Sequence, residues 1–451
     1  MTGPDRVAVV GGGMLGMVLA LRLRQQGRSV VLLERAPRLG GLAAARSIGG
    51  YTWDRFYHVI APSDQTLLDL LDEIGLGDRV RWGTTRTGFY TDGVLHSLST
   101  TLEFLRFPPL SPIDKARLGG TILYASRIRD GRRLESVGVV EWLTRWSGRN
   151  TVDKIWLPLL KAKLGENYRL ASAAFIWAIV ARMYAARRSG LKREQFGYVD
   201  GGYALVLERL ARTLESAGVE VRTGVRVTRV ETTPEGAVVR TEAGDDVEAE
   251  RVVLTVPATR VGELCPELTS AERDRLGRVT YQGIACASLL LERPLADFYV
   301  TNITDPAIPF TAVIEMTALV DRERFGGASL VYLPRYLTQD DDFWRRSDDE
   351  IEAEFLAALE RMYPAFRREQ VIAFQVSRVR EVLAVATRDY TETTLPAVET
   401  SLPSVFLVSS AQIANGTLNV NETISLAMEQ AERLGTRWGA PRARATMAVT
   451  G

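Results

Sequence analysis

The sequence predicts a mixed α/β fold, and three observations near its start support that prediction. Residues 7–10, "VAVV", form a continuous apolar run, as expected of a strand buried on both faces of a parallel sheet. A glycine-rich turn and a stretch with helical spacing, "MVLALRLRQQG", come next. A second apolar run, "SVVLLE", then ends at Glu34. This order of strand, turn, helix and strand predicts a Rossmann-like dinucleotide-binding unit.

The turn reads Gly11-x-Gly13-x-x-Gly16, and each glycine has a separate physical task. The first allows the tight turn, the second lets backbone amides approach a pyrophosphate, and the third lets helix and strand pack closely. Met14 and Leu15 begin the helix, whose N-terminus is expected to hold the diphosphate. Glu34 follows the third glycine by 18 residues and is placed to accept hydrogen bonds from the adenosine ribose.

Length, charge and cysteine content narrow the class of protein. A chain of 451 residues suggests two to three domains, and a net charge of +1 gives no reason to expect a nucleic-acid partner. Cys265 and Cys286 lie in apolar surroundings without metal-ligand spacing, so we expect neither disulfides nor a metal site. The sequence shows no secretion signal, and its most apolar stretch, 171–186, is short and contains Arg182. A cytoplasmic protein is predicted.

Residues 34–41, "ERAPRLGG", resemble the Glu-x(3)-Arg-x-Gly-Gly continuation of the flavin amine oxidase superfamily, which includes protoporphyrinogen oxidases and phytoene desaturases. The resemblance implies FAD as the cofactor, in a discontinuous Rossmann-like FAD-binding domain of the glutathione-reductase type. It also implies that the residues of this stretch lie against the FAD diphosphate and flavin, namely Arg35, Arg38, Gly40, Gly41 and Leu42.

Two later segments resemble the points where this family's chain re-enters and leaves the FAD domain. The first, 197–231, holds a glycine pair, an amphipathic helix and two strands, and includes Val227. The second, "AERVVLTVPA" at 249–258, includes Val256. We therefore predict an FAD-binding domain from residues 1–100, 201–260 and 401–451. Residues 101–200 form a helical basic insert, and 261–400 a substrate domain whose mixed β-sheet is a roof over the flavin in related folds.

The C-terminal part of the family pattern is altered. Its strand, "VFLVSS" at 405–410, ends in two serines where relatives carry Gly-Asp, so the usual acidic contact to the ribityl chain is missing. Asn419 is expected to cap the next helix, with Glu422 reaching back to it. That helix N-terminus would stabilise reduced flavin. The expected contacts with the cofactor are Ser410, Gln412, Thr417, Leu418 and Asn419, with Asn415 as another neutral substitute and Asn419 also a candidate catalytic residue.

One histidine stands at a position that the resemblance makes interesting. In "GGYTWDRFYHVI", residues 49–60, Asp54 and His58 keep the spacing of the family's Gly-x-x-Asp-x-Gly-x-His pattern, whereas residues 55–57 depart from it. The neutral-range pKa of histidine suits proton transfer, so His58 is a candidate catalytic residue, with a structural role as the alternative. Tyr203 is a candidate substrate contact. His96 follows the predicted Asp92-Gly93 hairpin turn and is expected to be structural.

Positive charge is concentrated in the predicted insert. Residues 101–200 hold 18 Lys and Arg against 9 Asp and Glu. Three interpretations stay open: a helical lobe with a solvated basic face, an anion clamp, or a face that rests peripherally on an anionic membrane. The clamp would use Arg132, Arg133, Lys161 and Lys163. The last two interpretations fit a small-molecule substrate with an apolar body and an anionic group, such as an isoprenoid phosphate, a porphyrin or a nucleotide sugar.

The leading functional hypothesis is an FAD-dependent oxidoreductase that dehydrogenates or oxidises such a substrate, with a hydride passing to the flavin. Many amine-oxidising relatives use a lysine from the second half of the chain, and no lysine follows Lys192. Amine oxidation is therefore disfavoured. One alternative is a non-redox flavoenzyme resembling UDP-galactopyranose mutase, and another is a flavin-binding partner protein without catalysis. The sequence leaves the substrate, the electron acceptor and the oligomeric state open.

Overall fold

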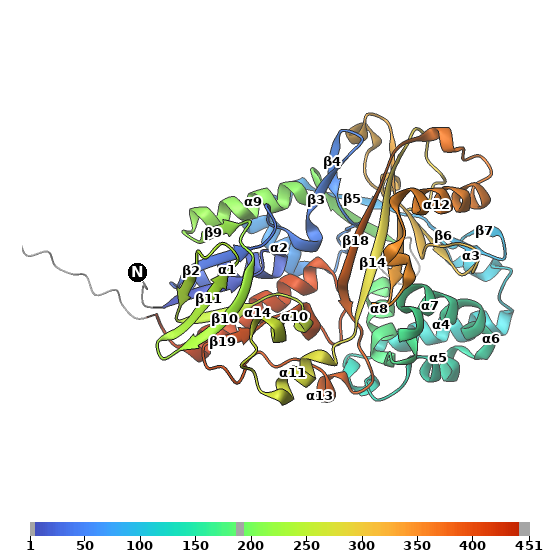
Figure 1. Cartoon of the computed structure of the whole chain (residues 1–451). Coiled ribbons are helices and arrows are strands. Elements are labelled where there is room, and N and C mark those ends of the chain that lie inside the picture. Colours follow the sequence, from blue (N-terminus) through green and yellow to red (C-terminus); the bar gives the residue numbers. More distant parts are fainter. Residues whose placement is uncertain (1–4, 186–193, 442–451) are drawn as a thin grey trace, which may run out of the picture.

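A computed structural model describes residues 5–185 and 194–441 and confirms the α/β class (Figure 1). At its centre is a five-stranded parallel sheet in the order β19-β13-β1-β2-β9. Strands β1 and β2 are nearly continuous apolar runs. Such runs suit the middle of a parallel sheet, where both faces of a strand are buried. The strands are β1 (Arg6–Val10), β2 (Ser29–Glu34), β9 (Glu220–Thr223), β13 (Arg251–Leu254) and β19 (Val405–Leu407).

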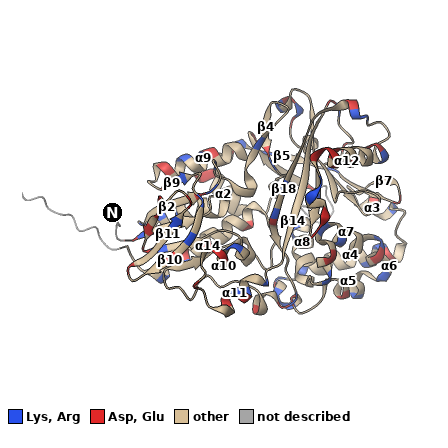
Figure 2. Cartoon of the chain, in the orientation of Figure 1, with Lys and Arg blue, Asp and Glu red and all other residues tan. Residues whose placement is uncertain are grey.

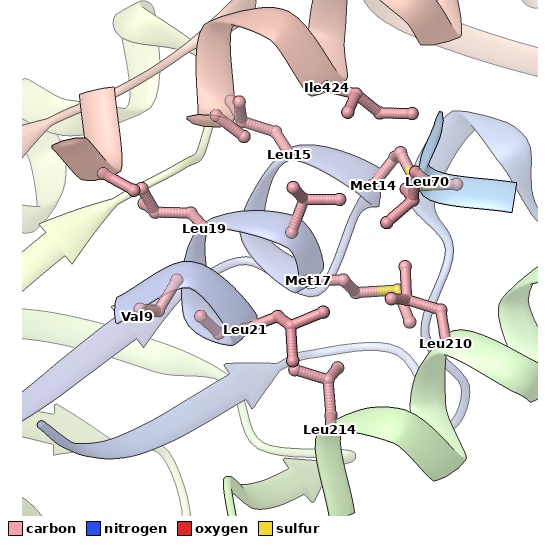
Figure 3. Close-up of a cluster of buried hydrophobic side chains, with 14 of the residues drawn as sticks. Val9, Met14, Leu15, Met17, Leu19, Leu21, Leu70, Leu210, Leu214 and Ile424 are labelled. Atoms are coloured by element: carbon pink, nitrogen blue, oxygen red, sulfur yellow. The ribbon is translucent and has the colours of Figure 1, made fainter. Parts of the chain in front are cut away.

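Helix α1 (Met14–Gln25) lies against one face of this sheet, between α9 (Gly202–Ser216) and α14 (Val420–Trp438). Figure 3 shows the cluster of apolar side chains that joins them, with Met17 facing Leu210 of α9. These side chains are fully buried, and burial of each contributes about 1.5–3 kcal/mol. The close packing fixes the position of the turn between β1 and α1.

The opposite face of the parallel sheet is covered by a three-stranded antiparallel sheet, β10-β11-β12. Its strands are β10 (Val227–Thr233), β11 (Gly236–Thr241) and β12 (Val247–Ala249). The helix and two strands predicted after Gly201 are therefore confirmed as α9, β9 and β10.

A seven-stranded mixed sheet, here called the roof, has the order β18-β14-β17-β16-β15-β6-β7. Helix α12 (Asp348–Met362), capped by Ser347 and Glu350, packs on its outer face. Its inner face is turned toward residues 42–59 of the dinucleotide-binding half. The strands are β6 (Thr87–Thr91), β7 (Val94–Ser97), β14 (Tyr281–Leu291), β15 (Val300–Ile303), β16 (Ala312–Glu315), β17 (Ser329–Leu337) and β18 (Val371–Ala384).

Two of the predicted domain limits differ from the structure. The hairpin β6–β7 forms as predicted, with Asp92 and Gly93 at positive φ, but β6 pairs with β15 and so belongs to the roof. Strand β8 (Gln195–Val199) pairs with β5 (Val80–Thr84), so the helical insert ends before residue 195. In both cases the hydrogen-bonding partner is a strand distant in sequence, which the local pattern does not reveal.

The insert is helical, as predicted, and has its own apolar core. Its main helices are α3 (Thr101–Arg106), α4 (Pro112–Arg127), α5 (Val139–Ser147), α7 (Leu157–Leu164) and α8 (Ala173–Ala185). Most apolar side chains of α8 are buried in that core. Within the described ranges, every helix is too short or too polar to span a bilayer.

Charges of both signs are spread over the insert (Figure 2). Several of its cations hold carbonyl oxygens: Lys115 donates to Leu105 O at 2.8 Å, and Lys154 to Pro109 O at 3.0 Å. Arg117 donates to Arg145 O near the end of α5 at 3.3 Å. Leu105 and Arg145 lie near the C-terminal ends of α3 and α5, where cations are favoured because the helix carbonyls carry partial negative charge. Part of the positive excess therefore stabilises the insert itself.

Candidate functional site

The glycine turn after β1 has the geometry of a diphosphate cradle. A Cβ on Gly16 would lie 1.8 Å from Gly11 O, so only glycine fits there. A Cβ on Gly13, by contrast, would meet no atom nearer than 3.9 Å. Gly13 is also the N-cap of α1 and provides no side-chain hydrogen bond. The first amides of α1 consequently face open space at the positive end of the helix dipole, where an anion binds well.

A second glycine pair packs against the first turn. Gly40 N donates to Gly12 O at 2.8 Å, and a Cβ on Gly41 would lie 3.1 Å from Gly13 Cα. Both residues have positive φ, 128° and 56°, which favours glycine. The two loops thus meet with only backbone between them, which suits an extended cofactor that lies across both.

Glu34 is fixed at the end of β2 by backbone amides. Its two carboxylate oxygens accept from Gly12 N at 2.6 Å and from Ala36 N at 2.7 Å. Arg35 and Arg38 are exposed close by, and no ion pair joins either one to an acid in the described part of the chain. A carboxylate, free helix amides and unpaired guanidinium groups are the donor and acceptor set that an adenosine diphosphate requires.

Thr255, which the sequence analysis did not predict as a site residue, stabilises the glycine turn after β1. Its Oγ1 lies 3.0 Å from both Val10 O and Gly11 O. Thr255 directly follows β13, the strand next to β1 in the sheet. A hydroxyl residue at that position was the sequence signal that could have predicted its role. Val256, next to it, is half-buried. Val227 lies at the start of β10, pairs with Thr241 and packs on the core between the two sheets.

The other predicted cofactor contacts differ in whether their side chains are exposed enough to touch the cofactor. Met14 and Leu15 point into the core in Figure 3, so only their backbone amides can meet a phosphate. Four predicted contacts are only partly buried or exposed at the junction of the two halves: Gly41, Leu42, Thr417 and Leu418. Ser410 begins a short 3-10 turn after β19.

In the loop after β19, Asn419 caps α14 as predicted, whereas Gln412 is bound by its own loop. Gln412 is held by its own loop, with Nε2 donating to Leu407 O and Pro396 O and Oε1 accepting from Ser409 N. Asn419 caps α14, since Oδ1 accepts from Glu422 N at 3.0 Å while Nδ2 donates to Thr417. The predicted ribityl contact of Gln412 and catalytic role of Asn419 therefore compete with backbone bonds. Asn415 differs, because its buried Oδ1 has no partner within the described residues.

Glu422 does not complete the predicted capping box, because only the bond to Asn419 Oδ1 is formed. Its carboxylate instead lies close to Gly416. Burial raises its pKa, and the nearby charge of Arg182 partly opposes that shift. Arg182 in turn binds Asp64 with two bonds of 2.6 and 2.9 Å, which ties α8 of the insert to the N-terminus of α2 (Gln65–Glu73). Residues 187–190, "RRSG", would suit the edge of an anionic membrane, but they lie outside the described residues.

His58, Asp54 and Tyr203 are brought together at the start of α9. Asp54 Oδ1 accepts from Tyr203 N at 2.7 Å, and Asp54 Oδ2 lies 3.6 Å from His58 Nδ1. The aspartate thus supplies the N-terminal capping bond of α9, which begins at the glycine pair. Tyr203 is only 3% exposed and packs in the core with α1, and its contact with substrate stays a prediction. His58 is partly exposed, with its ring 4.9 Å from that of Tyr203.

A phenol pair on the inner face of the roof was not predicted. Tyr57 OH lies 2.8 Å from Tyr336 OH, which also accepts from Lys163 Nζ at 2.6 Å. Burial raises the pKa of Tyr57 well above its ordinary value, and the neighbouring phenol adds to the shift. Lys163 therefore reaches the roof from α7, although Lys161 lies beside Tyr168 and is exposed.

The predicted clamp does not assemble as a unit. Arg132 and Arg133 are exposed on a 3-10 turn, Gly131–Leu134, that packs against α8. Helix α7, which carries both lysines, packs instead against β17 and β15. The two pairs belong to different faces of the insert.

Comparison with known proteins agrees with this geometry. A family model described as flavin-containing amine oxidoreductase matches residues 15–434. Among curated proteins, coproporphyrinogen III oxidase of Mycobacterium tuberculosis is 28% identical over 282 residues, covering 58% of this chain. That match spans only 61% of the relative's own length.

Two solved structures show the same fold. A protein of Exiguobacterium sp. 255-15, provisionally named as a protoporphyrinogen oxidase, superposes with a TM-score of 0.77 at 20% identity, covering 96% of this chain and 99% of its own. Reduced UDP-galactopyranose mutase gives 0.73 at 14% identity, covering 96% and 95%. At these identities the similarity shows the fold alone.

Proposed function

Because the chain belongs to the flavin-containing amine oxidoreductase family, we propose that it is an FAD-dependent oxidoreductase that dehydrogenates a partly apolar, anionic substrate of the porphyrinogen class. The relative named coproporphyrinogen III oxidase supports this choice. So does the absence of any lysine after Lys192, where amine-oxidising relatives use one. When bound, FAD supplies the hydride acceptor.

The observation that carries the proposal is the composition of the inner face of the roof. Apolar side chains from five of its strands cluster above residues 42–59, and the pair Tyr57 and Tyr336 lies among them. Its partly exposed members, among them Tyr57 and Tyr336, suit contact with a flat apolar ring system, since aromatic rings pack well on one another. Lys163 adds a positive charge at its edge, which favours an anionic substrate over an amine.

The residues around this face can also handle the proton that leaves with each hydride. His58 Nδ1 lies 3.6 Å from Asp54 Oδ2, so the carboxylate would stabilise the imidazole after it accepts a proton. Tyr57 keeps its proton because burial raises its pKa, so it acts as a hydrogen-bond donor and not as a base. We assign the proton-accepting role to His58 and the positioning role to the phenol pair.

The test compares substrates with the FAD-loaded enzyme. Coproporphyrinogen III should yield the fluorescent porphyrin in the presence of oxygen or a quinone, whereas an aliphatic diamine should yield neither aldehyde nor peroxide. His58→Gln should lower kcat, because glutamine cannot accept the proton. Turnover of the diamine alone would contradict the proposal. Activity on a nucleotide sugar that requires reduced enzyme but consumes no reductant would point instead to mutase chemistry.

A further inference from the structure

Two arginines at the junction of the two halves form no ion pair with an acidic side chain in the described part of the chain. Arg46 lies on β3 (Ala45–Ile48) and Arg55 directly follows β4 (Tyr51–Asp54). Each is partly buried, and no ion pair joins either to a carboxylate among residues 5–185 and 194–441. A guanidinium group removed from water without a counter-ion is unfavourable, so this position calls for an anion.

The hairpin places both side chains on one face. Arg46 stands opposite Trp53 in the β3–β4 register, and Arg55 N continues the ladder by donating to Ala44 O at 3.0 Å. Since side chains alternate along a strand, residues 44, 46, 53 and 55 share a face. The two guanidinium groups lie close enough for the charge of Arg46 to lower the pKa of Arg55, and burial lowers the pKa of both.

That face is turned toward the inner side of the roof. Arg46 Nη1 donates to Ser377 Oγ at 2.7 Å and to Val376 O at 3.2 Å, and Arg55 Nη2 donates to Arg378 O at 3.3 Å. Ser377 pairs with Cys286, which belongs to the apolar cluster of the inner face. The pair thus stands at the border of the surface that the proposed function assigns to the substrate body.

The surrounding charges leave an excess of positive charge. Asp348 is the acid that acts on Arg46, but it is already bound by Arg378 at 2.6 Å. Arg346, on the same side, is paired with Glu354. The bonds that Arg46 and Arg55 do form go to neutral oxygens, and these leave most of their nitrogen donors free for a carboxylate or phosphate.

We infer that Arg46 and Arg55 form the subsite that receives the anionic group of the substrate, in place of the basic residues of the insert. The inference rests on the proposed function for the identity of the substrate body, but the anion subsite itself does not depend on turnover. Its ligand is a carboxylate or a phosphate attached to an apolar group, because guanidinium pairs bind either one through two hydrogen bonds.

Binding to the FAD-loaded enzyme tests this without turnover. The probes are octanoate, octyl phosphate and 1-octanol, followed by perturbation of the flavin spectrum and by calorimetry. In the double variant R46Q/R55Q, the Kd of both anions should rise about tenfold or more, while that of octanol changes less than about twofold. The matched double variant R132Q/R133Q should bind all three as the wild type does. The anion whose Kd rises more in R46Q/R55Q shows whether the subsite prefers a carboxylate or a phosphate.

Three results would overturn the inference: wild-type affinity for octanoate and octyl phosphate no higher than for octanol, an equal loss for octanol in R46Q/R55Q, or a loss of anion binding in R132Q/R133Q alone. Unchanged FAD content and thermal midpoint exclude misfolding, and single variants replace the double one if it fails that check. Failure of the enzyme to turn over coproporphyrinogen III would contradict only the proposed function, because these binding results do not require it.

Discussion

The dinucleotide-binding half and the roof build their parts of the site by different means. In the first, backbone amides and glycines close together in sequence, Gly11 to Gly16 and Gly40 to Gly41, form the cradle. In the second, side chains far apart in sequence meet, as when Lys163, Tyr336 and Tyr57 form one hydrogen-bonded chain. A site built from backbone tolerates few substitutions, whereas a site built from side chains can change its ligand one residue at a time.

The sharpest contrast within the first half is between two of its glycines, and here we expect the largest effect. In G16A the new Cβ would collide with Gly11 O, which should cost more than about 3 kcal/mol of folding free energy and abolish FAD binding. In G13A the new Cβ has room in the protein but occupies the space left for a phosphate. G13A should therefore keep the thermal midpoint of the apoprotein and still lose FAD.

Denaturant unfolding of both apoproteins and FAD content after reconstitution measure this contrast. Equal loss of stability in the two variants would show that the open space at Gly13 is not a cofactor site.

The roof offers a pH-dependent test at Glu315 of β16. Burial raises its pKa to about 7, although Ala296 N and Ser329 Oγ donate to it. The folded protein thus retains a proton that the unfolded chain loses, so stability falls as pH rises from about 4.5 to about 7, by up to about 3 kcal/mol. E315Q carries a neutral group at every pH and should not show this decline.

The measurement is the difference in thermal midpoint between pH 5 and pH 8, compared for wild type and E315Q. Identical differences in the two proteins would mean that Glu315 is ionised in the folded state.

The contact between the insert and the dinucleotide-binding half should contribute less. Arg182→Met removes both bonds to Asp64 and leaves that carboxylate buried, and the expected loss is about 1–3 kcal/mol because Arg182 is partly exposed. The double variant R182M/D64N should recover part of the loss, since no buried charge is left unpaired. A double-mutant cycle from urea unfolding gives the coupling free energy between Arg182 and Asp64. Additive losses of stability would contradict the predicted interaction.

The smallest effect is expected for the exposed arginines of the insert. R132Q/R133Q should change stability by less than about 0.5 kcal/mol, and KM for substrate not at all. Steady-state kinetics decide this. A severalfold rise in KM would show that these arginines of the insert bind the anionic group of the substrate.

These contrasts also explain which parts of the fold and of the site could be predicted from the sequence. The turn at Gly11–Gly16, Glu34 and the cap at Asn419 depend on neighbours within a few residues, so local patterns predicted their positions. The membership of β6 and β8 in their sheets depends on partners elsewhere in the chain. The burial of Tyr203 could not be predicted, because its place in a helix does not show which face is buried. The arginines at 46 and 55 gave no signal, since their significance depends on which groups of the roof lie near them in the folded chain.

Anaerobic mixing of the FAD-loaded enzyme with coproporphyrinogen III tests the central claim most directly. If the roof presents an anionic, partly apolar substrate to the flavin, one equivalent should bleach the visible flavin absorbance in a single turnover, and R46Q/R55Q should require a higher substrate concentration for the same rate. Flavin that stays oxidised in a fully loaded enzyme, yet is bleached by a diamine, would contradict the account.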